Sequence, residues 1–257
     1  MRLTILGSSA SYPGAGQACA GYLVETDEAR VLFDCGPGVL ANLGRVCNPL
    51  TLDAVFVTHN HPDHIVDLYA LQALLRYSPD GPADPMVLWM PQDLFERMSC
   101  LLSDRGAREL REAFDCRDLS ACDPVTIKDL RITPHPVVHT DPTFALVAES
   151  DGARLCYTAD TMPGAAVLSA ARDADLLLAE ATLPQQYAGR APHLTAAEAG
   201  ALASDAGVGE LVLTHVWPTN DRGLMAAEAA ELFDGPVTIA TELATYEVIP
   251  SSRRKMR

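Results

Sequence analysis

Basic residues are scarce in this chain of 257 residues, in which 19 Lys and Arg stand against 34 Asp and Glu and give a formal net charge of -15. No apolar run approaches the length of a membrane span, and the one at the amino terminus is too short for a signal peptide. The seven cysteines include no C-x-x-C pair. These absences argue against an extended nucleic-acid surface, a membrane protein and a disulfide scaffold. They predict a cytoplasmic protein with reduced thiols.

A dense group of ligand-type residues follows an apolar run at residues 52–57, which has the length and composition of a strand buried on both faces. We expect Pro62 to prevent a helix from beginning before this group is complete. A histidine-rich surface turn is the alternative interpretation, but zinc, manganese and iron all accept imidazole and carboxylate ligands at such a density. The group has the pattern H-x-H-x-D-H and consists of His59, His61, Asp63 and His64.

This motif resembles the signature of the metallo-β-lactamase superfamily, a set of binuclear metallohydrolases with a four-layer αββα fold. The resemblance implies that His59, His61 and a later His hold a first metal. Asp63, His64 and a distant His would hold a second metal, and a later Asp would bridge the two. The resemblance extends over nearly the whole chain. We therefore expect one hydrolase domain over residues 1–250, followed by a basic tail at 251–257, and the family suggests a homodimer.

Three later residues complete the implied ligand set. His139 follows the apolar pair Val137 and Val138, as the third His of the family does, whereas His135 is better interpreted as a surface or supporting residue. Asp160 and His215 each follow a short apolar strand, at 155–157 and 211–213. Helices predicted at 164–174 and 196–206 alternate with such strands, and this order predicts parallel strands whose carboxyl ends gather ligands. Asp160 would be the bridge and His215 the last ligand.

Other residues are assigned supporting or catalytic roles by the same resemblance. Asp34 ends a strand before the turn D-C-G-P-G, where the family has an Asp that supports the metal site; a solvated carboxylate is the alternative. Glu180 in A-E-A-T and His193 in P-H-L-T resemble the paired Glu and His of the ribonuclease Z-like phosphodiesterase branch. There the His lies over the scissile phosphate and the Glu orients it. We count Asp63, His193 and Glu180 as catalytic; for His193 the alternative is a surface loop histidine.

The implied reaction is hydrolysis of a phosphodiester with two divalent metal ions, zinc in the first place and manganese or iron as alternatives. The metals would lower the pKa of a shared water, so that hydroxide attacks phosphorus. Val138 stands where lactamases and thioesterases of the superfamily have Gly, which argues against acyl substrates. The short interval between His139 and Asp160 leaves no room for the tRNA-binding arm of ribonuclease Z.

We therefore predict an enzyme for small phosphodiesters, with 3′,5′-cyclic nucleotides as substrates. Small bacterial cyclic-nucleotide phosphodiesterases of this branch lack the arm, and the segments G-Y-L-V-E and A-T-Y-E-V resemble theirs. Loops after Gly7 and Pro218 are available to hold the base. A ribonuclease Z-type tRNA 3′ endonuclease and a metal-binding module without turnover are the alternatives. Residues 91–125, expected to be helical at 91–110 with a break near Gly106, offer no recognisable chemistry.

Overall fold

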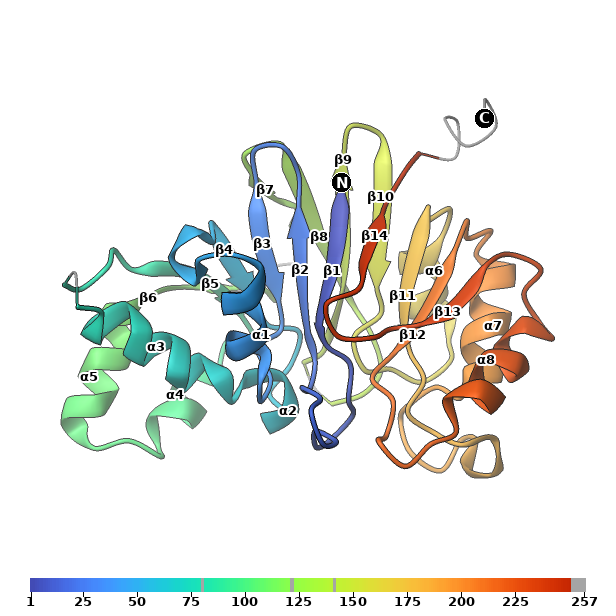
Figure 1. The fold of residues 1–257 in the computed structure, drawn as a ribbon, viewed down its shortest axis with the longest axis horizontal. Helices are drawn as coiled ribbons and strands as arrows, with labels where there is room; N and C mark the ends of the chain where they lie inside the picture. Colours follow the sequence, from blue (N-terminus) through green and yellow to red (C-terminus); the bar gives the residue numbers. More distant parts are fainter. Residues whose placement is uncertain (80, 121–122, 141, 251–257) are drawn as a thin grey trace.

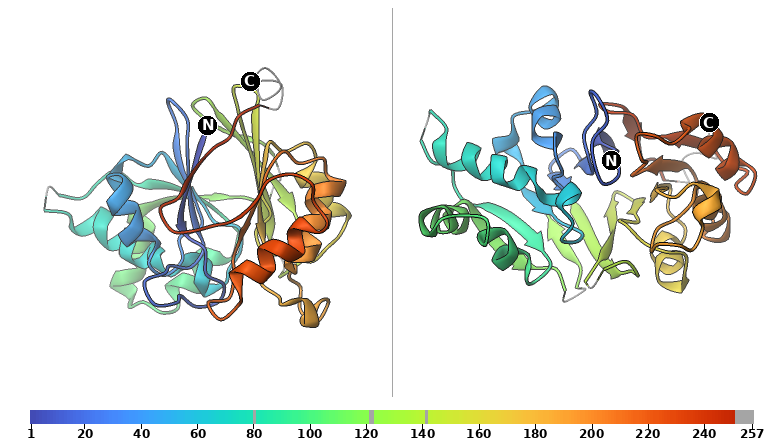
Figure 2. Two further views of the ribbon diagram at one scale, coloured as in Figure 1. Left: turned by 45° about the vertical axis from the view of Figure 1, so that its right-hand side comes forward. Right: turned by 90° about the horizontal axis from the view of Figure 1, so that it is seen from below.

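Two seven-stranded sheets lie face to face, and helices cover the outer face of each (Figure 1). The computed structural model describes residues 1–79, 81–120, 123–140 and 142–250, so the expected basic tail at 251–257 lies outside the described residues. Figure 2 shows the same layers from two other sides, with helices outside and sheets inside. The αββα arrangement predicted from the sequence is confirmed.

The first sheet has the strand order β14-β1-β2-β3-β4-β5-β6. Neighbouring strands are antiparallel from β14 to β3 and parallel from β3 to β6. The parallel half places the carboxyl ends of β3 and β4 at the same edge of the sheet. The strands are β1 (Arg2–Gly7), β2 (Gly21–Glu25), β3 (Arg30–Phe33), β4 (Ala54–Phe56), β5 (Met86–Met90), β6 (Phe114–Asp118) and β14 (Thr245–Glu247).

The second sheet has the order β13-β12-β11-β10-β9-β8-β7. Its strands are parallel from β10 to β13, as the alternation of strands and helices predicted, and antiparallel from β7 to β10. Several strands of this sheet therefore also end at one common edge. They are β7 (Val125–Ile127), β8 (Leu130–Pro136), β9 (Phe144–Ser150), β10 (Ala153–Tyr157), β11 (Leu176–Glu180), β12 (Leu211–Thr214) and β13 (Val237–Ile239).

The helices divide between the two outer faces, where apolar side chains of helix and sheet form two outer cores. A third core fills the space between the sheets. None of the helices in the described ranges combines the length and apolarity needed to cross a bilayer. On the first sheet lie α1 (Val39–Val46), α2 (Pro62–Ile65), α3 (Asp67–Tyr77), α4 (Leu94–Ser99) and α5 (Asp104–Ala113); on the second lie α6 (Ala165–Ala171), α7 (Ala196–Asp205) and α8 (Arg222–Ala230).

Two helix predictions were wrong in detail. Helix α2 begins at Pro62, inside the ligand group, because proline is favoured at the first position of a helix, where its missing N–H is not needed. The break expected near Gly106 lies earlier: Ser103 caps α5 by accepting a hydrogen bond from the N–H of Gly106. The capping box of Thr195 and Glu198 at the start of α7 is present.

Two buried tyrosines cross the core between the sheets. Tyr22 of β2 lies with its hydroxyl oxygen 2.9 Å from Oγ1 of Thr214 on β12. Tyr157 of β10 donates a hydrogen bond of 2.9 Å to Oδ2 of Asp34, which follows β3. The two rings pack with centroids 4.7 Å apart. Burial raises the pKa of both phenols, so both remain protonated.

Candidate metal centre

The residues predicted as ligands meet at the edge where strands of both sheets end, the lower edge in Figure 1. The first sheet contributes the segment after β4, which contains His59 and His61 and continues into the first turn of α2. The second sheet contributes residues after β8, β10 and β12. Parallel strands direct their carboxyl ends to one place, which is why ligands so distant in sequence come together.

The first group is formed by His59, His61, His139 and Asp160, whose ligating atoms lie within 4.8 Å of one another. Nδ1 of His61 is 3.1 Å from Nε2 of His59 and 3.1 Å from Nε2 of His139. Oδ2 of Asp160 is 3.6 Å from Nε2 of His59 and 3.7 Å from Nε2 of His139. Four potential ligand atoms thus surround one point.

The second group is formed by Asp63, His64 and His215. Nε2 of His215 lies 3.2 Å from Nε2 of His64 and 3.1 Å from Oδ2 of Asp63. Oδ1 of Asp160 lies 3.4 Å from Nε2 of His64, so the two carboxylate oxygens of Asp160 face the two groups. The structure therefore brings together all seven residues that the sequence predicted as ligands, with Asp160 between them.

This arrangement fits divalent metal ions. Metal–nitrogen and metal–oxygen bonds of about 2.0–2.2 Å in a tetrahedron place ligand atoms about 3.3–3.6 Å apart, close to the separations found here. Asp160 is buried, and its Oδ1 accepts no hydrogen bond from any residue that the structure describes. A buried carboxylate oxygen without a hydrogen-bond donor is costly unless a cation is beside it.

The imidazole rings are held from behind by protein oxygens. Each of four histidines uses Nδ1 for this contact, which leaves Nε2 directed to the groups described above. Such contacts fix the ring orientation before any ion binds. The contacts of Nδ1 are His59 with Oγ1 of Thr58 at 3.0 Å, His64 with Oδ2 of Asp34 at 2.8 Å, His139 with the carbonyl oxygen of Pro192 at 2.8 Å, and His215 with Oγ1 of Thr182 at 2.8 Å.

Asp34 lies directly behind the second group. Its buried carboxylate accepts hydrogen bonds from the backbone N–H and hydroxyl of Thr58 as well as from Tyr157, and it contacts His64. The residue adopts a left-handed conformation with φ of 57°, which Asp tolerates better than most residues. Asp34 is therefore a buried hub that joins both sheets to a predicted ligand, and the interpretation as a solvated carboxylate does not hold.

Burial and neighbouring charges shift the pKa values of the histidines in different directions. Burial is the main cause that lowers the pKa of His59 and His139, which favours the neutral imidazole that metals bind. Burial also opposes the charged form of His64, but the carboxylates of Asp160 and Asp34 outweigh it and raise the pKa. For Asp63, burial is outweighed by the hydrogen bond with His215 and the charge of His64, and the pKa is lowered.

Glu180 and His193 form a pair beside this centre. Oε1 of Glu180 lies 2.9 Å from Nδ1 of His193, and the buried carboxylate also accepts hydrogen bonds from the backbone N–H groups of Thr161 and Thr182. Nδ1 of His193 is 3.9 Å from Oδ2 of Asp160. Its ring centroid lies 4.6 Å from that of His139. His193 is thus next to both groups, and by distance alone it could also serve as a ligand with Asp160 and His215.

A family model described as a β-lactamase superfamily domain matches residues 29–216, which include the residues of both groups. The chain belongs to the β-lactamase superfamily. Its His and Asp groups and its similarity to a probable metallo-hydrolase make it a metal-dependent hydrolase.

Three relatives show how closely the chain resembles other superfamily members. Rv1339 of Mycobacterium tuberculosis is 34% identical over 255 residues, covering 96% of this chain and 92% of its own. The probable metallo-hydrolase YhfI of Bacillus subtilis is 30% identical and covered completely, and its crystal structure matches with a TM-score of 0.85, covering 96% of this chain and 99% of that chain. Ribonuclease Z of Myxococcus xanthus is 29% identical over 303 residues, covering 96% of this chain and 98% of its own.

Some contacts of this superfamily site could not be read from the sequence. The backbone N–H of Ser11 donates a hydrogen bond of 2.7 Å to Oδ2 of Asp63, and the hydroxyl of Thr182 contacts both Glu180 and His215. A backbone N–H group cannot be recognised from the residue type. Only the turn-rich loop after β1 indicated its position. His135 is half-buried on β8 and belongs to neither group.

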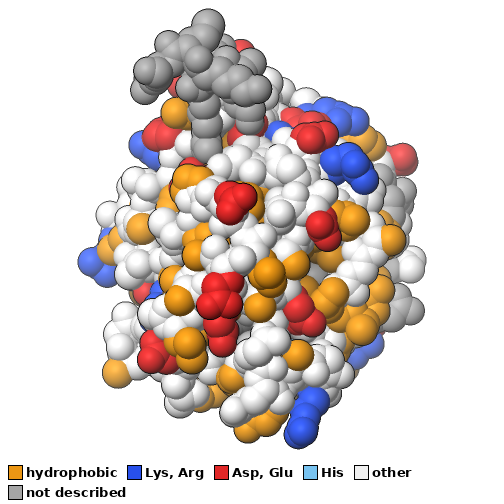
Figure 3. All heavy atoms as spheres, turned by 90° about the vertical axis from the view of Figure 1, so that its right-hand side faces the viewer, with side chains coloured by type: hydrophobic (Ala, Val, Ile, Leu, Met, Phe, Trp, Pro, Cys, Tyr) orange, Lys and Arg blue, Asp and Glu red, His pale blue; other side chains and the backbone are white. Residues whose placement is uncertain are grey.

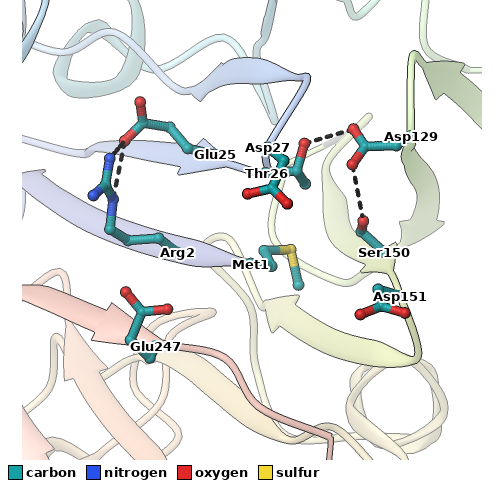
Figure 4. Close-up of a pocket in the computed structure, with 9 residues that line it drawn as sticks. All are labelled: Met1, Arg2, Glu25, Thr26, Asp27, Asp129, Ser150, Asp151 and Glu247. Carbon is teal, nitrogen blue, oxygen red and sulfur yellow. Dashed lines mark hydrogen bonds and ion pairs between the residues drawn. The ribbon is translucent and has the colours of Figure 1, made fainter.

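A separate pocket of about 280 Å³ lies at the opposite ends of the strands, where β1 begins and the turn between β9 and β10 is found (Figure 4). Among the described residues that line it, Arg2 has the one cationic side chain, and Arg2 is already paired with Glu25 at 2.7 Å. The other charged side chains are carboxylates, which repel a phosphate anion. They are Glu25, Asp27, Asp129, Asp151 and Glu247. The pocket does not suit an anionic ligand.

Proposed function

We propose that this hydrolase cleaves small phosphodiesters, with 3′,5′-cyclic nucleotides as its substrates, and that it uses two divalent metal ions. His59, His61 and His139 would hold one ion, and Asp63, His64 and His215 the other, with Asp160 between them. When bound, the ions would supply an acidified water for attack and positive charge beside the phosphate. Zinc is the first choice because the ligand atoms are spaced as in a tetrahedral site; manganese and iron also accept imidazole and carboxylate ligands and are the alternatives.

The protein's own acid–base group in this proposal is His193. Glu180 accepts a hydrogen bond from Nδ1 of His193 and fixes the ring beside Asp160. The ring is then placed to stabilise charge on a phosphate oxygen or to protonate the leaving oxygen. Burial lowers the pKa of His193, but the hydrogen bond and charge of Glu180 outweigh it and raise the pKa, which favours the protonated form of an acid. Asp63 would hold its metal with its orientation fixed by the backbone N–H of Ser11.

The observation that carries the choice of substrate is the hairpin between His139 and Asp160. Strands β9 and β10 pair along their length, from Leu146 with Tyr157 to Ser150 with Ala153, so the interval contains a tight turn and no arm. This turn lies at the far ends of the strands, away from the metal centre. An enzyme that grips tRNA needs cationic contacts away from the cleavage point, and this segment offers none near the centre.

Surface charge and relatives support the same choice. The face that includes α6, α7 and α8 shows acidic side chains across its middle and Lys and Arg toward its edges (Figure 3). The alignment with ribonuclease Z of Myxococcus xanthus runs over 303 residues, so that enzyme contains segments that this chain of 257 residues lacks. The alignment with YhfI runs over 253 residues and needs no comparable insertion.

A substrate panel tests the proposal. Cyclic AMP, cyclic GMP, phosphocarbohydrate diesters and a pre-tRNA with a 3′ trailer should be assayed with zinc and with manganese. We expect rapid hydrolysis of the cyclic nucleotides and little cleavage of the pre-tRNA. Efficient trailer cleavage with inert cyclic nucleotides would overturn the proposal and favour a ribonuclease Z activity, as in the relative from Myxococcus xanthus.

A further inference from the structure

One wall of the metal centre is made by two loops that are joined to each other. The loop after β1 and the loop after β12 exchange backbone hydrogen bonds, from the N–H of Val216 to the oxygen of Ser8 at 2.9 Å and from the N–H of Ala10 to the oxygen of Val216 at 3.1 Å. His215, a predicted ligand, directly precedes this junction. The wall is therefore positioned by the same backbone as the metal centre.

Trp217 stands on this wall and is connected to the second ligand group through Ser11. Nε1 of Trp217 donates a hydrogen bond of 3.3 Å to Oγ of Ser11, and the N–H of Ser11 donates to Oδ2 of Asp63 at 2.7 Å. Ser11 adopts φ of 62°, a left-handed conformation that is uncommon and strained for Ser. Strain of this kind persists where the surrounding contacts require one conformation, and here that conformation joins an indole ring to a metal ligand.

The environment of Trp217 differs from that of the other tryptophan. The sequence contains two, Trp89 and Trp217. Trp89 stacks on Phe56 of the neighbouring strand and so has a packing role. Trp217 is only half-buried, and no aromatic ring packs on it within the described ranges. Tyr12, the residue after Ser11, has 49% of its surface exposed. Large aromatic side chains left partly open beside a reactive centre suggest a stacking surface for a ligand.

We propose that Trp217, together with Tyr12 of the loop to which it is joined, holds the nucleotide base by stacking while the phosphate occupies the metal centre. This inference rests on the proposed function and adds to it how the substrate is recognised. Stacking on a neutral ring requires no cation, which agrees with a chain of net charge -15. Because every base has a flat aromatic face, stacking discriminates little among bases. Cyclic AMP and cyclic GMP should both be accepted. Cyclic nucleotides with a pyrimidine base should bind more weakly, because the pyrimidine ring is smaller.

The test separates base binding from the integrity of the metal centre. Wild type, Trp217→Phe and Trp217→Leu should be compared on cyclic AMP and on ribose 3′,5′-cyclic phosphate, which has no base. We expect Trp217→Leu to raise KM for cyclic AMP about 10-fold or more with little change in kcat, since loss of one base–aromatic stack is worth about that much. KM for the baseless substrate should stay within about twofold. Trp217→Phe keeps a ring and should lie close to wild type.

Two controls make the result decisive. Tyr77→Leu removes an exposed aromatic ring at the end of α3 and should change neither KM. Quenching of tryptophan fluorescence by AMP should be seen in wild type and lost in Trp217→Phe. Equal loss on both substrates, with loss of bound metal, would show that Trp217 only supports Asp63, and no effect on either would also overturn the inference. A wild type that cleaves the baseless diester but no cyclic nucleotide would instead refute the proposed function itself.

Discussion

His193 and Glu180 are joined by a hydrogen bond of 2.9 Å, and the carboxylate of Glu180 is completely buried. Replacing His193 with Ala should leave both metals in place and lower turnover by about 100-fold or more, as expected when a positioned acid is removed. Metal content and kcat, measured on the same preparation, check this. His135→Ala is the matched control, since His135 lies outside both ligand groups. If His193→Ala loses metal instead, His193 is a ligand.

Wild-type protein should contain two metal ions per chain, and Asp160→Ala should lose at least one of them together with nearly all activity. The physical reason is that the two oxygens of Asp160 face different ligand groups. Elemental analysis after dialysis measures the stoichiometry. Asp205→Ala, which removes an exposed carboxylate at the end of α7, should retain both ions. A single ion in the wild type would contradict the binuclear assignment.

Salt should have little effect on catalysis. A substrate with one phosphate is held at the metal centre, so KM for cyclic AMP should change by no more than about twofold between 50 and 200 mM salt, whereas binding through many phosphates weakens by orders of magnitude over that range. Initial rates at several salt concentrations provide the measurement. A steep fall in affinity would indicate an extended anionic substrate.

The stability of the first sheet should depend on Glu25 at neutral pH. Burial alone raises the pKa of Glu25, but hydrogen bonds from Arg2 and Arg30 outweigh burial and lower the pKa. The charged carboxylate therefore stabilises the fold above the unfolded-state pKa of about 4.3, and this stabilisation is lost as the pH falls through the folded-state pKa. Both arginines are partly exposed, so Glu25→Gln should cost only about 1–2 kcal/mol at pH 7.

Urea unfolding at pH 7 and near pH 3 would measure this effect. The difference between wild type and Glu25→Gln should shrink at the lower pH. Glu247→Gln is the matched control, because Glu247 lies opposite Arg2 in the sheet but is exposed, and it should cost less than about 0.5 kcal/mol. A pH-independent difference would mean that packing, not charge, explains the loss.

The sequence revealed the local part of the site much better than the distant part. His59 to His64 lie within one short segment, so their spacing alone indicated a metal site. His139, Asp160 and His215 could be chosen only through the family resemblance, because nothing local distinguishes a strand-end ligand from an ordinary polar residue. The contact of the Ser11 backbone with Asp63 was beyond prediction, since an N–H group is common to nearly all residues.

The predicted start of a helix was wrong where two effects of proline compete. Pro62 interrupts a helix when it lies inside one, but it favours a helix that begins at its own position, and here the second effect decides. Strand β6 was not expected because its sequence FDCRD has little apolar alternation. It lies at the edge of the first sheet, and only its first residue, Phe114, is buried, so a regular apolar alternation is not required. The oligomeric state stays a prediction.

The tyrosines that cross between the sheets have a consequence for the metal centre. Apolar contacts are not directional, whereas a hydrogen bond requires a particular distance and angle between its two partners. The hydrogen bonds from Tyr157 to Asp34 and between Tyr22 and Thr214 involve tyrosines from opposite sheets, and they fix the position of one sheet relative to the other. Because each sheet carries some of the ligands, these two hydrogen bonds also determine how far apart the ligands of the two sheets lie. Substitution of a tyrosine between the sheets can therefore lower metal binding or activity without changing a ligand.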